Sequence, residues 1–84
     1  MNTLKVLRSE IDHIDEQLVA LIEKRTHIAA SIGKIKQQNH IEILDCQREI
    51  LVMKAIRKHT TVSIVQKHLE YIYKEIMTLA KATQ

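Results

Sequence analysis

The sequence has almost none of the residues that interrupt helices. Among its 84 residues there is no proline and only one glycine, whereas 45% of the residues are hydrophobic. Sheet proteins depend on glycine and proline at their turns, so this composition favours an all-α protein. The length suffices for one small domain, and we predict a single helical domain over residues 1–84.

Aromatic residues, cysteine and excess charge are also scarce. Phe and Trp are absent, which leaves Tyr71 and Tyr73 as the only aromatic side chains that could stack on bases. The net charge of +3 is spread along the whole chain, so we expect no nucleic-acid partner. The single cysteine, Cys46, cannot form an intrachain disulfide and fits a reducing compartment.

Long apolar runs are missing as well. No run approaches the roughly 20 residues needed to cross a bilayer, and the N-terminus lacks the apolar segment of a secretion signal. We therefore expect a cytoplasmic protein with no membrane partner. The five histidines do not pair at i, i+4 with one another or with the cysteine, and there is no glycine-rich phosphate loop or serine nucleophile motif. From these absences we predict that the protein has no metal site and needs no cofactor.

The sequence does carry a long helical period. From about Thr3 to Gln38, apolar residues recur at steps of three and four, which predicts one helix of about 36 residues and about 54 Å. The apolar positions are Leu4, Leu7, Ile11, Ile14, Leu18, Leu21, Ile22, Ile28, Ala29, Ile32 and Ile35. A compact globule of this length would be only about 30 Å across. The first helix should therefore extend beyond the rest of its own chain. Its apolar stripe must then be covered by a second chain, which predicts an intertwined homodimer.

Two shorter helices are expected after the first. The polar stretch 37–43 predicts a loop, and apolar spacing predicts a second helix over residues 43–58. A third helix should follow a cap at Thr61 or Ser63 and run to the C-terminus. The predicted fold is thus three helices per chain with a very long first helix.

Cations interrupt the apolar seams of the first two helices. Arg25 and Lys36 lie within the apolar series of the first helix, Arg8 lies near its start, and Arg48 lies within the series of the second. Any one of these long side chains can extend to water. A set of inward cations without matching inward carboxylates instead favours an anionic ligand.

The start of the second helix concentrates charge on one face. Asp45, Arg48, Glu49 and Val52 are spaced i, i+3, i+4, i+7 and should lie side by side. One interpretation is that the three charged residues neutralise one another on a partly solvated face. The other is that they belong to the same anion site as the cations of the first helix.

The order of these residues resembles a known family. The run L-R-x-x-I-D-x-I-D-x-x-L-x-x-L-I-x-x-R over residues 7–25 is followed by G-K-x-K over 33–36 and D-x-x-R-E over 45–49. This pattern resembles the all-helical (type II) chorismate mutases and extends over residues 4–56 without a gap. The third helix resembles the family more loosely, with Ala80 where a serine is usual. The proline that often precedes the family's aspartate is absent before Asp45.

The resemblance implies how the substrate carboxylates would be bound. Arg25 and Arg48 would bind them from the site's own chain. Arg8 would reach into the site of the partner subunit. Position 80 would line the same site, where Ala80 offers no hydroxyl.

The resemblance also implies how the reacting bond would be addressed. Lys36 and Gln84 would donate to the ether oxygen of the bond that breaks, while Asp45 and Glu49 would hold the ring hydroxyl. The family reaction converts chorismate to prephenate in aromatic amino-acid biosynthesis by an intramolecular rearrangement. Such a step needs no nucleophile, metal or proton transfer; it needs a folded substrate and donors where negative charge develops.

Two classes of alternative remain open from the sequence. An isochorismate-pyruvate lyase or an aminodeoxychorismate mutase of the same fold would use the same dicarboxylate pocket. A non-enzymatic helical dimerisation module would instead leave Arg25, Lys36 and Arg48 solvated and individually replaceable.

Overall fold

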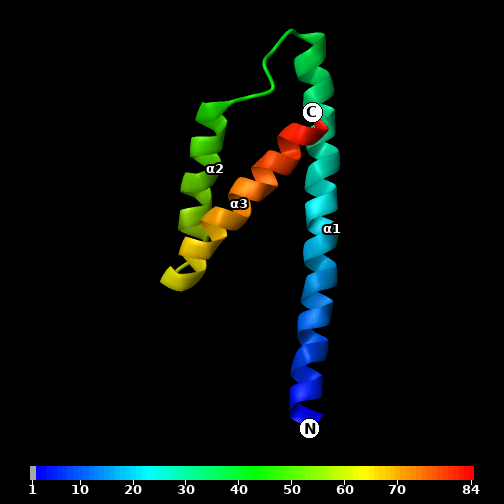
Figure 1. The fold of residues 1–84 in the computed structure, drawn as a ribbon, viewed down its shortest axis with the longest axis vertical. Coiled ribbons are helices and arrows are strands. Elements are labelled where there is room, and N and C mark those ends of the chain that lie inside the picture. The colour runs from blue at the N-terminus through cyan, green and yellow to red at the C-terminus, as the bar shows by residue number, and fades with distance from the viewer. Residues whose placement is uncertain (1) are drawn as a thin grey trace.

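The computed structural model describes residues 2–84 and contains three helices (Figure 1). Helix α1 spans Asn2–Gln38, α2 spans Cys46–His59 and α3 spans Ser63–Thr83. No strand occurs within these residues. The predictions of an all-α fold, of three helices and of a very long first helix are therefore confirmed.

The length of α1 determines the shape of the chain. Its 37 residues correspond to about 55 Å at the usual helical rise. The chain measures 57 × 25 × 15 Å, and its radius of gyration is 16.3 Å, well above the roughly 12 Å expected of a compact globule of this length. The N-terminal half of α1 extends beyond the rest of the chain as a single helix (Figure 1).

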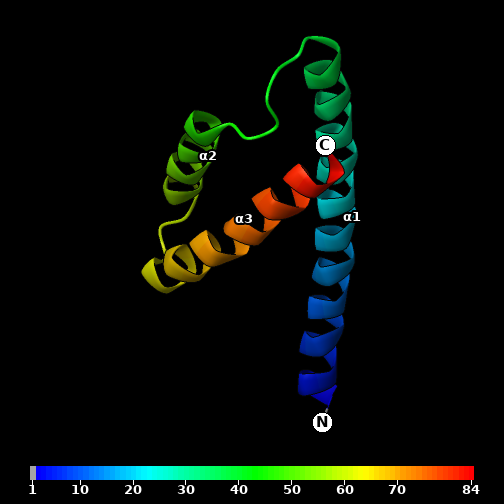
Figure 2. The same cartoon turned by 45° about the horizontal axis from the view of Figure 1, so that its top comes forward.

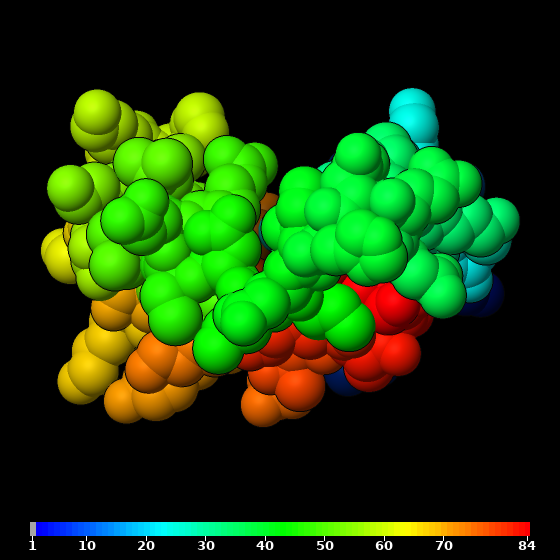
Figure 3. Space-filling view, turned by 90° about the horizontal axis from the view of Figure 1, so that it is seen from above, coloured from blue at the N-terminus to red at the C-terminus, as the bar shows by residue number. Residues whose placement is uncertain are grey.

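Helix α3 connects the other two helices. It packs against α2 at its N-terminal end, and its C-terminal end crosses to the C-terminal part of α1, where Gln84 lies against Gly33 (Figures 1 and 2). The side chains that this packing buries are few: Ala29, Ile56 and Met77, one from each helix. The loop between α1 and α2 bridges the top of the arrangement and leaves a hollow between the two helices (Figure 3).

The apolar stripe on the N-terminal half of α1 is uncovered within the chain. Every residue from 2 to 24 is exposed, including the regularly spaced apolar ones. Leu4, Ile11 and Ile14 expose 47%, 57% and 53% of their surface. An apolar patch of this extent is typical of an interaction surface.

Two helix starts differ from the sequence prediction. Helix α2 begins at Cys46 rather than at Ile43, because the Asp45 side chain caps it by accepting a hydrogen bond of 2.9 Å from the backbone N–H of Arg48. The N-cap of α3 is Val62, which forms no side-chain cap hydrogen bond, so the predicted caps at Thr61 and Ser63 are wrong.

Helix α1 ends at Gln38, as predicted. His40 adopts a left-handed conformation with φ of 55°. The Ile41 N–H then donates to the Lys36 carbonyl at 2.8 Å and the His40 N–H to the Gln37 carbonyl at 3.3 Å. This pair of bonds is the Schellman arrangement, which satisfies the last carbonyls of the helix and turns the chain toward α2.

None of the described helices is long and apolar enough to cross a membrane.

Candidate functional site

A cavity of about 300 Å³ lies where the C-terminal end of α3 passes between α1 and α2. Of the eight residues that the sequence singled out, seven line it: Arg25, Lys36, Asp45, Arg48, Glu49, Ala80 and Gln84. These residues come from all three helices and from the loop before α2. The fold therefore gathers positions up to 59 residues apart around one hollow.

Helix α1 supplies two cations whose orientation is constrained. The Arg25 guanidinium lies 6.0 Å from the centroid of the Tyr73 ring, at the outer limit of a cation–π contact. The Lys36 ammonium donates a hydrogen bond of 2.7 Å to the Ile43 carbonyl. An ammonium has three donors, so Lys36 retains two for a ligand while the loop holds it at the cavity.

Helix α2 presents its charged face to the cavity, as its spacing predicts. Asp45, Arg48, Glu49 and Val52 all line the hollow. Mutual neutralisation does not explain this face, because within residues 2–84 no ion pair joins the Arg48 side chain to either carboxylate. Asp45 caps the helix, and Glu49 pairs with Lys81 of α3, Oε2 to Nζ, at 3.2 Å.

Helix α3 brings Gln84 to the cavity through close contact with Gly33. A Cβ at Gly33 would lie 2.7 Å from the Gln84 Cα, so the approach requires a glycine. The Oε1 atom of Gln84 is buried and has no hydrogen-bond partner among the described residues. A buried polar atom without a partner is costly, which makes this amide a candidate ligand contact.

The cavity is cationic. Its lining includes four cationic side chains, Arg25, Lys36, Arg48 and Lys81, and two carboxylates, Asp45 and Glu49. The excess of two positive charges suits a ligand with two negative charges. Within residues 2–84, no group of three or more His, Cys, Asp or Glu side chains is close enough to hold a metal ion.

Comparison with known proteins identifies the family. The family model for chorismate mutase type II matches residues 7–84. The chain belongs to this family. The resemblance drawn from residues 7–49 is therefore confirmed, and the match also includes α3, where the sequence pattern was looser.

Individual relatives agree with the family assignment. The T-protein of Haemophilus influenzae is 42% identical over 57 residues, which are 68% of this chain and 15% of that protein. A bifunctional chorismate mutase/prephenate dehydratase of Aquifex aeolicus is 37% identical over 82 residues, 93% of this chain and 23% of that protein. A chorismate mutase of Methanocaldococcus jannaschii is 38% identical over 55 residues, 66% of this chain and 56% of that protein.

The chain spans less than a quarter of the length of the first two of these relatives and about half of the third. No solved structure matches it.

One predicted residue of this chorismate mutase family member lies outside the cavity. Arg8 is exposed on the N-terminal half of α1, away from the end where α3 meets it (Figure 1). Within residues 2–84, Arg8 forms no ion pair. A single chain thus brings together seven of the eight predicted residues and leaves Arg8 apart from them.

One cavity residue, Lys81, is missing from the sequence prediction. It lies on the same face of α3 as Met77, Ala80 and Gln84, with the spacing i, i+3, i+4, i+7 from Met77. The spacing predicts that Lys81 shares a helix face with Ala80 and Gln84, but it does not predict the ion pair with Glu49 of α2.

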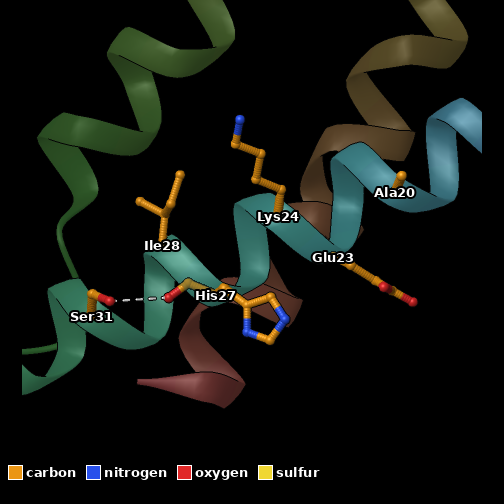
Figure 4. A pocket seen from close by; sticks show the side chains of 6 residues that line it. All are labelled: Ala20, Glu23, Lys24, His27, Ile28 and Ser31. Atoms are coloured by element: carbon orange, nitrogen blue, oxygen red, sulfur yellow. Dashed lines mark hydrogen bonds between the residues drawn. The ribbon is translucent and has the colours of Figure 1, made fainter.

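A second hollow on α1 lacks the character of a site. It is lined by Ala20, Glu23, Lys24, His27, Ile28 and Ser31. Figure 4 shows that these side chains point in different directions along the helix. The Ser31 hydroxyl donates to the His27 carbonyl of its own helix at 3.3 Å. No group of polar atoms converges there, so we assign the function to the cavity between the three helices.

Proposed function

We propose that this chain is a chorismate mutase that rearranges chorismate to prephenate in aromatic amino-acid biosynthesis, and that residues 1–84 form a single chorismate mutase-like domain. The observation that carries the proposal is the convergence of seven expected residues on one cationic cavity. Family membership adds support, since the M. jannaschii relative is a chorismate mutase and the A. aeolicus relative carries that activity in its name.

The two arginines of the cavity would bind the carboxylates of chorismate. Guanidinium groups form paired, charge-assisted hydrogen bonds to carboxylates, and Arg25 and Arg48 reach the cavity from two different helices. Binding both carboxylates from opposite sides restricts the substrate to a folded shape. Holding reacting atoms close together in this way is the larger part of what an intramolecular rearrangement requires.

The donors to the ether oxygen would be Lys36 and Gln84. As the carbon–oxygen bond breaks, negative charge develops on that oxygen, and fixed donors stabilise it. Lys36 has donors to spare beyond its bond to the Ile43 carbonyl, and Gln84 lines the same cavity, where the NH2 group of its side-chain amide would donate. Glu49 and Asp45 would hold the ring hydroxyl, whereas Ala80 would contribute shape alone.

The functional unit we propose is an intertwined homodimer. The apolar stripe over residues 4–22 of α1 is exposed in the single chain and needs cover. A second copy would offer the same stripe and bury both. In that arrangement, Arg8 of each chain would complete the cavity of its partner. We also propose that the enzyme works in the cytoplasm, without nucleic-acid, membrane or cofactor partners.

The decisive experiment is the loss of chorismate absorbance on addition of the purified protein, with the product identified chromatographically. We expect prephenate. Isochorismate and aminodeoxychorismate are supplied in parallel, and preferential conversion of either would assign the chain to a related enzyme of the same fold. No turnover of any of the three would leave a dimerisation module as the better description.

The shared site has a separate test. Arg8→Ala and Arg25→Ala chains should each be inactive alone, because each lacks one of the arginines that every site requires. Mixed and refolded together, they should regain activity, since one of the two sites in the heterodimer then has both arginines. A demonstrably mixed dimer without activity would contradict the sharing, and a stable folded monomer at micromolar concentration in sedimentation would contradict the dimer.

A further inference from the structure

We propose that Lys81 is a positioning residue for Glu49, and that it thereby controls how well the cavity binds a dianionic substrate. This inference rests on the proposed function. The observation behind it is the ion pair between the Lys81 Nζ and the Glu49 Oε2, 3.2 Å apart, which links α3 to α2 across the cavity.

The geometry makes this pair part of the site. Both residues line the cavity, and the side chains expose only 36% and 31% of their surface. The charged neighbours that line the cavity beside Glu49 are Arg48 and Asp45. Asp45 is occupied as a helix cap, and the Arg48 side chain forms no ion pair with Glu49 within residues 2–84. Lys81 is therefore the cation that fixes the direction of the Glu49 carboxylate.

The ion pair reduces the electrostatic repulsion between the Glu49 carboxylate and a dianionic substrate. A carboxylate in the cavity is useful for accepting a hydrogen bond from a substrate hydroxyl, yet it repels the two carboxylates of chorismate. Lys81 offsets that charge by engaging Oε2, and within residues 2–84 Oε1 accepts no hydrogen bond, so it is left for the hydroxyl. Charge repulsion of this kind acts on the bound substrate and on the transition state alike, so it affects KM more than kcat.

The test is a double-mutant cycle on steady-state kinetics. We expect Lys81→Met to raise KM about three- to fivefold, the scale of a partly exposed ion pair, with kcat changed less than about twofold. Lys81→Arg should restore KM, and raising the salt concentration should shrink the effect. In the Glu49→Gln background, Lys81→Met should raise KM less than it does in the wild type, because the carboxylate that Lys81 positions is gone and only the loss of one positive charge from the cavity remains.

The matched control is Lys67→Met, which removes the same charge from an exposed position on α3 outside the cavity. It should leave KM unchanged. Thermal unfolding of each variant separates a loss of folding from a loss of positioning.

The outcomes distinguish this inference from the proposed function. The same cycle is measured as equilibrium affinity for prephenate, which needs no catalysis. An active wild type whose KM is insensitive to Lys81→Met would refute the positioning role alone. A rise in KM of the same size in the Glu49→Gln background would show that Lys81 acts on the substrate independently of Glu49, and would refute it too. An inactive wild type that still shows the coupling in prephenate affinity would overturn the enzyme assignment and leave the role of the Lys81–Glu49 pair standing. A wild type with neither activity nor coupling would overturn both the enzyme assignment and the positioning role.

Discussion

The contact between Gly33 and Gln84 predicts that adding one methyl group on α1 will slow catalysis without preventing folding. In a Gly33→Ala variant the new Cβ would lie 2.7 Å from the Gln84 Cα and 2.9 Å from its Cβ. Ordinary contact begins near 3.4 Å, so the end of α3 must move by about 0.7 Å. The obstacle is partly backbone, which cannot be relieved by a side-chain rotation.

The expected magnitude follows from that displacement. A misplacement of about 1 Å can cost about 10²-fold in rate, so we expect kcat to fall about 10- to 10²-fold. The effect on KM should be small, because Gln84 is proposed to stabilise charge that appears in the transition state. Stability should change modestly: alanine is favoured over glycine in a helix by about 1 kcal/mol, whereas overpacking costs about 1–3 kcal/mol.

The assay is steady-state turnover of chorismate, accompanied by urea unfolding to establish that the variant is folded. Gln84→Ala provides the matched comparison, since combining it with Gly33→Ala should add little if both act on the same amide. A folded Gly33→Ala enzyme with a kcat within twofold of wild type would refute the reasoning. A rate loss that adds in full to that of Gln84→Ala would show that the methyl group acts elsewhere, for example on Lys36 one turn further along α1.

Substitutions at three positions test separate parts of the site. Lys36→Ala should lower kcat about 10²–10³-fold with a smaller change in KM. Gln84→Ala should lower kcat less, because an amide is a neutral donor. A normal kcat for Lys36→Ala in steady-state assays would overturn the proposed role of Lys36. Asp45→Ala should lower the free energy of unfolding by about 1 kcal/mol through loss of the α2 cap, whereas Asp45→Asn should retain the cap and isolate the effect of the charge on KM. Equal stability of the two variants in urea would contradict the capping role.

Periodicity predicted the parts of the fold that depend on one helix at a time. The unbroken apolar steps from Leu4 to Ile35 gave α1 almost to its ends, and the spacing from Asp45 to Val52 gave the cavity face of α2. The start of α2 was misjudged because apolar residues before Asp45 continue the pattern, while a single side-chain hydrogen bond determines where the helix begins.

The parts that depend on two helices at once were not predictable from spacing. From the sequence alone, Gly33 only lowers the helix propensity of α1; its close contact with Gln84 becomes evident only once α3 is packed against α1. Lys81 lies within an apolar series and acquires a role only when Glu49 of another helix is found 3.2 Å away. Such contacts depend on the crossing of α3 over α1 and α2, which a chain without an internal repeat or a sharp turn signal does not encode locally.

The proposed dimer connects the small core of the single chain with the proposed sharing of its site. One chain buries Ala29, Ile56 and Met77 and leaves the apolar stripe on the N-terminal half of α1 exposed, so little of its hydrophobic surface stabilises the isolated chain. Arg8 lies on that exposed half, away from the cavity. If a second copy covers the stripe, the step that buries the apolar surface is also the step that delivers the arginine. Folding, dimerisation and assembly of the site would then be one event, because no stable intermediate has both a covered stripe and an empty Arg8 position.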